Sequence, residues 1–157
     1  MARIHPLVWM LAMLSVSWIA LINSVPGASA QAFSNQKVDK MKICIDMEGT
    51  EITATLDDNA ASRDFMSLLP MTLTLKDYAS TEKVSDLPNR LSTQGDPGGY
   101  APSVGDITYY APWGNLAIFH KDFQYSSGLI RLGILDSGVE LLRRPGEMKV
   151  TIRKADR

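Results

Sequence analysis

The most informative part of this sequence is GDITYYAPWGNLAIFHKD, residues 105–122. Within it, residues 106–110 and 115–120 are short runs of the kind that form strands. Residues 111–114, Ala-Pro-Trp-Gly, separate the two runs, and proline and glycine at these positions favour a loop. The stretch predicts two neighbouring strands joined by a short connection that carries Trp113.

Alternation of apolar and polar residues predicts more strands on both sides of this stretch. Further strands are expected over residues 41–47, 52–56, 71–76, 129–135 and 148–152. Glu48-Gly49 should join the first two strands as a hairpin. In the last strand, Met148, Val150 and Ile152 should point into the core.

The only cysteine, Cys44, alternates with Lys42 and Asp46 on the polar face of the first predicted strand. If that face is exposed, an oxidising compartment could link two chains through this thiol. A single cysteine forms no internal disulfide and excludes a cysteine-rich metal site. No cluster of His, Asp and Glu has metal-ligand spacing, so we expect neither a metal nor another cofactor.

One helix is predicted between the second and third strands, because apolar residues from Ala61 to Leu69 fall on one helical face. Any of residues 57–59 can cap this helix, and Pro70 should end it. A brief second helix is expected over residues 137–143, with Ser137 as its cap.

Residues 79–105 are rich in glycine and proline and should form a long irregular connection, a feature that is often functional. Together, seven or eight short strands and one or two short helices indicate a mainly β protein. A closed or nearly closed β-barrel is the architecture that this pattern favours.

The N-terminal residues differ in kind from the rest. An apolar run extends from Leu7 to Ile22, and Ala28-Ser29-Ala30 follows it. This is the pattern of a cleavable signal peptide, and the run is shorter than the roughly 20 residues that a membrane span needs. We therefore expect a signal peptide over 1–30, a linker over 31–40 and one domain over 41–154. The alternative is an uncleaved membrane anchor.

These features predict an exported, periplasmic or extracellular protein with no stable membrane span after cleavage of the signal. The net charge is −1 and no basic stripe is present, so we expect no nucleic-acid partner.

Residues 105–122, followed by 125–130 and 132–140, resemble the bacterial cyclophilin-like domain family. LLPMTLTL at 68–75 and Leu87-Pro88 fit the same pattern. The resemblance covers roughly residues 41–154, and it implies a cyclophilin-type closed β-barrel with a helix at its end. It does not imply prolyl isomerase activity, because the Phe-His-Arg run of true cyclophilins is absent.

Four residues are candidates for a ligand-binding groove: Arg90, Tyr110, Trp113 and Phe119. Trp113 lies on a predicted loop, where aromatic residues often line grooves, although it could instead plug the end of the barrel. Tyr109 and Tyr110 should point to opposite faces of a strand, so one belongs to the core.

An isomerase would need a donor aimed at the prolyl nitrogen, and Arg90 is the weak candidate for that catalytic role. The alternative is a solvated charge on a mobile loop. His120 is expected at the surface, since no nucleophile motif accompanies it.

Two functions remain open. The first is an exported cyclophilin-like binding module for a peptide or a small ligand, without strong catalysis. The second is a peptidyl-prolyl cis-trans isomerase that acts on exported proteins. A structural domain without a groove is the third reading.

Overall fold

The structure is a computed structural model that describes residues 40–156. The expected signal peptide at 1–30, and all of the expected linker except Lys40, lie outside the described residues. Within residues 40–156, no helix has the length and apolar character needed to cross a membrane.

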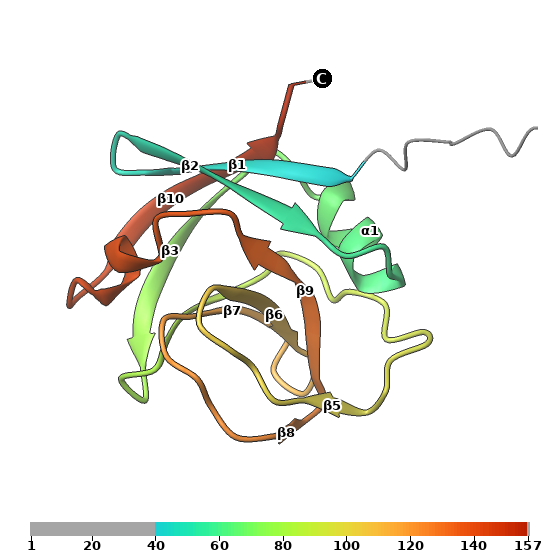
Figure 1. The fold of residues 1–157 in the computed structure, drawn as a ribbon. Helices are drawn as coiled ribbons and strands as arrows, with labels where there is room; N and C mark the ends of the chain where they lie inside the picture. Colours follow the sequence, from blue (N-terminus) through green and yellow to red (C-terminus); the bar gives the residue numbers. More distant parts are fainter. Residues whose placement is uncertain (1–39, 157) are drawn as a thin grey trace, which may run out of the picture. The chain divides into compact units, whose positions relative to one another are not determined.

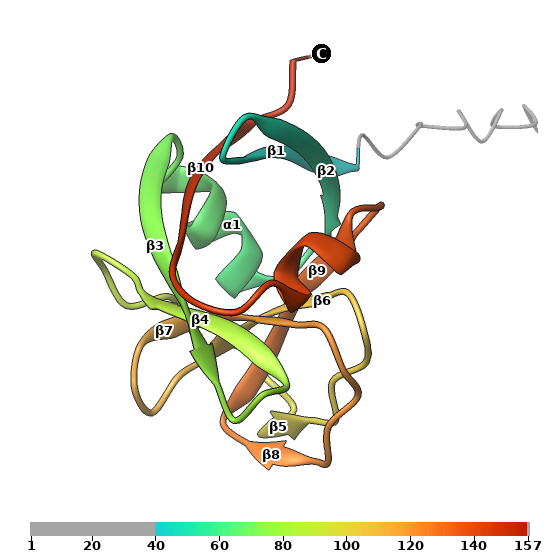
Figure 2. The same ribbon diagram turned by 90° about the vertical axis from the view of Figure 1, so that its left-hand side faces the viewer.

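Eight strands close into an antiparallel barrel, as the sequence pattern predicts. They are β1 (Met41–Met47), β2 (Thr50–Leu56), β3 (Met71–Tyr78), β4 (Glu82–Asp86), β6 (Asp106–Tyr110), β7 (Asn115–Phe119), β9 (Leu129–Leu135) and β10 (Met148–Lys154). Their order around the barrel is β1-β10-β3-β4-β7-β6-β9-β2 (Figures 1 and 2). The remaining strands, β5 (Gly99–Tyr100) and β8 (Ser126–Ser127), pair with each other outside the barrel.

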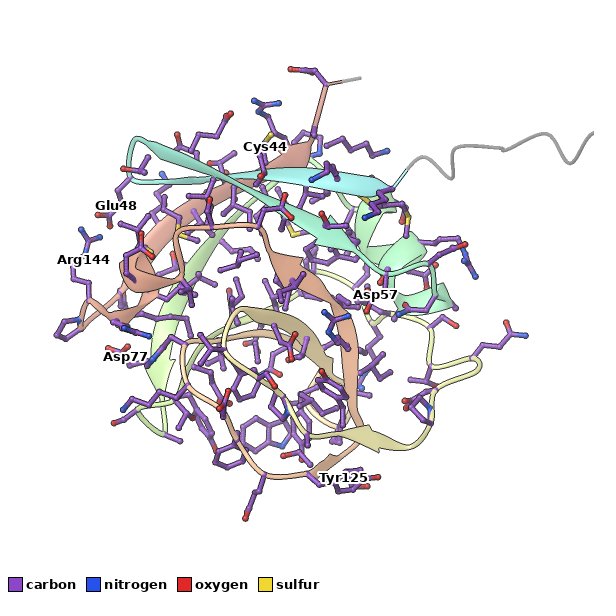
Figure 3. The ribbon with its side chains drawn as sticks, viewed as in Figure 1. Cys44, Glu48, Asp57, Asp77, Tyr125 and Arg144 are labelled. Carbon is purple, nitrogen blue, oxygen red and sulfur yellow. The ribbon has the colours of Figure 1, made fainter. Side chains whose placement is uncertain are left out.

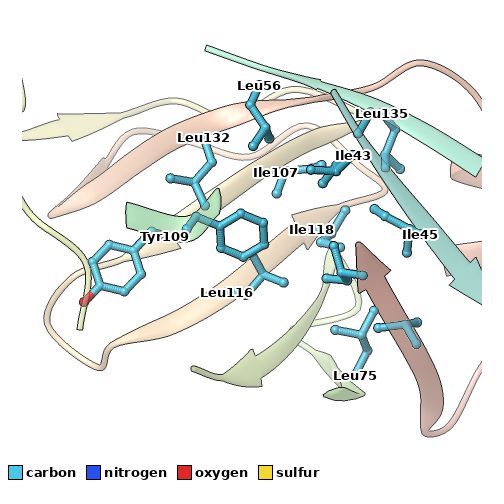
Figure 4. Close-up of a cluster of buried hydrophobic side chains, with 14 of the residues drawn as sticks. Ile43, Ile45, Leu56, Leu75, Ile107, Tyr109, Leu116, Ile118, Leu132 and Leu135 are labelled. Atoms are coloured by element: carbon cyan, nitrogen blue, oxygen red, sulfur yellow. The ribbon is translucent and has the colours of Figure 1, made fainter. Parts of the chain in front are cut away.

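The interior of the barrel is filled by the inward-facing side chains of the strands (Figure 4). On β1, Ile43 and Ile45 are fully buried, as period-two alternation requires. Met148, Val150 and Ile152 of β10 are also buried, which confirms the predicted register of that strand. Each such aliphatic side chain stabilises the fold by about 1.5–3 kcal/mol when it is removed from water.

The predicted helix is α1 (Ala60–Ser67), and it lies at one end of the barrel (Figures 1 and 2). Asn59 is its cap, because the side-chain oxygen of Asn59 accepts a hydrogen bond from the Ser62 N–H at 2.8 Å. Phe65 extends from α1 into the core and is fully buried. The helix therefore closes this mouth of the barrel with an aromatic plug.

A short 3₁₀ helix, η1 (Val139–Arg143), lies at the opposite end, where it is the dark orange turn on the left of Figure 1. The expectation that Ser137 caps it is wrong. Gly138 occupies the cap position with φ of 79°, and no side chain there bonds the helix N–H groups. A left-handed residue at the cap is easy for glycine alone, which explains why the cap lies one residue later than predicted.

Lys83 holds this end of the barrel together. Its side chain is fully buried, and its Nζ donates to the carbonyls of Arg144 and Gly146 at 2.7 Å each. The ammonium also forms an ion pair with Asp77 at 2.6 Å. The Lys83 ammonium and the Gly146 N–H together lower the pKa of Asp77. Figure 3 shows Asp77 and Arg144 at the same end of the molecule.

The strand β4 was not expected, because residues 79–105 were predicted to be irregular throughout. β4 pairs with β3 and with β7, so it is an integral part of the barrel wall. In its sequence, Glu-Lys-Val-Ser-Asp, the inward-facing residues are Lys83 and Ser85, which pair with Ile118 and Leu116 of β7. Both are polar, so the strand lacks the apolar alternation by which a strand is recognised. A strand that buries a lysine escapes hydrophobic pattern analysis.

The polar-face position predicted for Cys44 is found, but the exposure that a link between two chains requires is not. Cys44 lies on the outer face of β1 together with Lys42, but only 6% of its surface is accessible. Its neighbours across the sheet are Thr53 on β2 and Arg153 on β10. Cross-strand neighbours of this size cover a small thiol, so a polar-face position does not make it accessible.

Candidate functional site

A pocket of about 360 Å³ lies on the outer face of the barrel, over β4, β7 and β9. It exists because β7 alternates: Leu116 and Ile118 point into the core, whereas Asn115, Ala117 and Phe119 point outward. We call this the outer-face pocket. The segment from Phe123 to Ser127 passes over its side, and Figure 3 shows Tyr125 of this segment at the edge of the molecule.

The floor of the pocket is a second hydrophobic cluster, separate from the barrel core. Ala117, Phe119 and Leu129 are buried in it, and Val84 and Tyr110 pack against them. Each of these five residues also lines the pocket. An apolar floor outside the main core leaves apolar surface for a ligand to cover.

The rim of the pocket is aromatic and exposed. Trp113 is 58% accessible, and Tyr78 is 44% accessible. The Trp113 ring stands edge-on to Tyr78 at 5.8 Å and to Tyr110 at 5.3 Å between centroids. Phe123 is 38% accessible and stacks on Phe119 of the floor, with 6.3 Å between the ring centroids. Such rings offer large apolar surfaces that are held in place by their neighbours.

Besides Ser126 and Ser127, two buried polar side chains interrupt this apolar lining. Glu82 is only 9% accessible, and its Oε2 accepts a hydrogen bond from the Thr81 hydroxyl at 2.7 Å. Burial raises the pKa of Glu82, and the Thr81 hydrogen bond opposes that change. Asn115 is 5% accessible, and its Oδ1 has no hydrogen-bond partner within residues 40–156. The lining contains no Lys, Arg or His side chain.

Three of the four residues named from the sequence meet at this pocket: Tyr110, Trp113 and Phe119. Tyr109, the neighbour of Tyr110, is buried in the barrel core, as the opposite-face argument predicts. Trp113 lies on the turn between β6 and β7 and forms part of the rim.

Arg90 does not line the pocket. Its Nη1 donates to the carbonyl of Ala111 at 2.7 Å, and its side chain passes beside Gly114. The loop that carries Arg90 is anchored to the barrel. The next residue, Leu91, is buried, and its backbone N–H donates to the Tyr109 hydroxyl at 3.2 Å. Arg90 therefore braces the turn that carries Trp113.

His120 is not at the surface, which corrects the prediction for this residue. His120 is 6% accessible, and its backbone N–H donates to the Thr81 carbonyl at 2.9 Å, which holds the residue against the β3–β4 turn. Burial and the neighbouring Lys121 lower the pKa of His120. The sequence did not reveal this turn, because β4 itself was not predicted.

Sequence reasoning missed Tyr78, Glu82, Asn115 and Phe123 as pocket residues. Tyr78 and Glu82 flank the turn between β3 and β4. Because β4 was not predicted, there was no reason to expect either residue beside β7. Asn115 lies within residues 105–122, and Phe123 directly follows them. Asn115 and Phe119 are an even number of residues apart on one strand, so their side chains point to the same face. This spacing was the signal that could have identified Asn115.

A smaller cavity of about 190 Å³ lies between the start of α1 and residues 92–97. Arg131 lines it, and Figure 3 shows the nearby Asp57 at the α1 end of the barrel. The Arg131 guanidinium bonds both Asp57 and Asp106, so its charge is already compensated. Among residues 40–156, no group of three or more His, Cys, Asp or Glu side chains could hold a metal ion.

The chain is similar to a known protein family and to a solved structure. Residues 45–153 match the model of a family described as the cyclophilin-like family. The solution structure of a hypothetical protein from Archaeoglobus fulgidus has a similar fold, with a TM-score of 0.56 and 15% sequence identity. That similarity covers 74% of this chain and 95% of the archaeal chain. No curated protein matches the chain.

Proposed function

This chain belongs to the cyclophilin-like family, and we propose that it is an exported binding module that holds a peptide or a small ligand in the outer-face pocket. The observation that carries the proposal is the pocket itself. It combines an apolar floor with the exposed rings of Tyr78 and Trp113. Removal of such apolar surface from water by a ligand is favourable and stabilises the complex.

The position of Arg90 favours binding over isomerisation. A catalyst of prolyl rotation needs a preorganised donor directed at the substrate amide. The Arg90 guanidinium already donates to the Ala111 carbonyl, and the pocket lining holds no arginine. The pocket can seat an apolar ring but lacks a cationic donor beside it.

A prolyl isomerase is the second candidate, because the aromatic floor around Phe119 suits a proline ring. A peptide isomerisation assay separates the two functions, with Arg90→Ala and Phe119→Ala measured beside the native protein. The binding module predicts slow or undetectable catalysis. Catalysis that collapses in the Arg90 variant would make the protein an enzyme.

Export rests on the N-terminal pattern of the sequence, with Ala28-Ser29-Ala30 as the cleavage site. Mass spectrometry of the exported protein should find Gln31 as the first residue. Exported protein that keeps Met1 would contradict cleavage.

A further inference from the structure

Glu82 differs from the other buried charged groups of this fold. Within residues 40–156, the buried Lys, Asp and Glu side chains are Glu82, Lys83 and Asp106. Lys83 forms an ion pair with Asp77 at 2.6 Å, and Asp106 forms one with Arg131 at 2.9 Å. Glu82 forms no ion pair with any described residue, and its hydrogen bond comes from the neutral Thr81 hydroxyl.

An ionised carboxylate that is removed from water without a cation is costly, and proteins pair or neutralise such groups. Burial raises the pKa of Glu82, which is the response expected of a carboxylate that lacks a partner. Because Glu82 lines an open pocket rather than the core, the missing cation can come from outside the protein.

The surroundings of Glu82 also suit a cation. It lies between Tyr78 on β3 and Phe119 on β7, its direct partners across the sheet. Trp113 contributes a third ring to the same pocket, edge-on to Tyr78. The faces of aromatic rings attract ammonium and guanidinium groups, most strongly where water is partly excluded. The lining also lacks any basic side chain that would repel a cation.

Asn115 adds a preference for a cation that carries N–H groups. Its Oδ1 is covered and has no partner within the described part of the chain. The terminal torsion of asparagine has a broad, roughly two-fold preference, so the amide can turn this oxygen toward a ligand in the pocket. A ligand N–H would then supply the missing hydrogen bond.

We propose that the outer-face pocket binds a primary ammonium or guanidinium group on an apolar stem, with Glu82 as its counter-ion. Such a group occurs in a lysine or arginine residue of a peptide and in free alkylamines. The inference rests on the proposed binding function and gives that function a ligand chemistry.

The test is an NMR titration of the purified protein with blocked tripeptides that differ only at the central residue. The residues are lysine, trimethyl-lysine, acetyl-lysine and norleucine. We expect lysine to bind most tightly, and trimethyl-lysine to bind less tightly because it keeps the charge but has no N–H to donate. n-Butylammonium distinguishes the two sources: affinity equal to that of the lysine peptide assigns the site to free amines, and weaker affinity assigns it to peptides.

Glu82→Gln should weaken binding of the lysine peptide by about tenfold or more, since a charge-assisted hydrogen bond is lost. The same variant should bind the norleucine peptide as the native protein does. Glu140→Gln, which removes an exposed carboxylate on η1, is the matched control and should change neither affinity.

Norleucine or acetyl-lysine binding as tightly as lysine would overturn the cation proposal and leave the binding module standing. An unchanged affinity of the Glu82→Gln variant for lysine would also overturn it. Failure of every probe to shift a pocket resonance would instead count against the proposed binding function itself.

Discussion

Replacement of Gly133 by alanine should destabilise the barrel at the strand that closes it. On β9, Gly133 pairs with Leu56 of β2 and also with Ile107 of β6. A Cβ atom on Gly133 would lie 2.7 Å from the Leu56 Cα and closer still to the Thr55 carbonyl oxygen. Both of these neighbours are backbone atoms, which cannot rotate out of the way.

The size of the effect follows from this geometry. Overpacking of a tight site costs about 1–3 kcal/mol or more, and the upper end applies because the two strands themselves must separate. A loss of about 3 kcal/mol would lower the Tm by about 10 °C in a domain of this size. Such a loss is a large share of the roughly 5–15 kcal/mol that stabilises a typical domain.

Urea and thermal unfolding followed by circular dichroism measure the loss, with Gly95→Ala as the matched control. Gly95 has a φ of 79° but nothing within 4 Å of the position of a Cβ, so alanine there meets backbone strain alone. That strain costs about 1–2 kcal/mol. If Gly133→Ala were no less stable than Gly95→Ala, β9 would not approach β2 at Gly133 and the closed barrel would be refuted there.

Three further variants or treatments test individual side chains. Val150→Asp should lose several kcal/mol in urea unfolding, since an unpaired carboxylate would enter the core; native-like stability would show that the β10 register is wrong. Cys44 should react with a thiol reagent only after denaturation, and rapid labelling of the folded protein would contradict its burial. Glu82→Gln should raise the Tm near neutral pH, because burial raises the pKa of Glu82 and its ionised form opposes folding. This gain should shrink as the pH falls through that raised pKa, and a gain that grows on acidification would contradict the sign.

The barrel could be predicted from the sequence wherever one face of a strand is apolar. β1, β2 and β10 alternate cleanly, and the helix that carries Phe65 shows both its cap region and its proline stop. The prediction failed at β4, whose inward face holds Lys83. A buried lysine stabilised by Asp77 and by two carbonyls is a tertiary arrangement that no local pattern reports.

The candidate site was predictable only in part for the same reason. Trp113 and Phe119 are close in sequence to the most informative stretch, and their aromatic character marked them. Tyr78 and Glu82 reach the pocket only because β4 lies between β3 and β7. Arg90 was chosen for its chemistry, yet the carbonyls of the β6–β7 turn already hold its guanidinium. Which partner a charged side chain finds depends on the folded chain.

The most direct test of the binding function is an NMR map of where a lysine-containing peptide contacts the protein, from intermolecular cross-relaxation to the ring protons of Trp113 and Phe119. We predict contacts to both rings, and we predict that Trp113→Ala weakens binding of the peptide while the fold remains intact. Contacts confined to another surface, such as the cavity beside residues 92–97, would contradict the binding function, and so would an absence of contacts at saturating peptide.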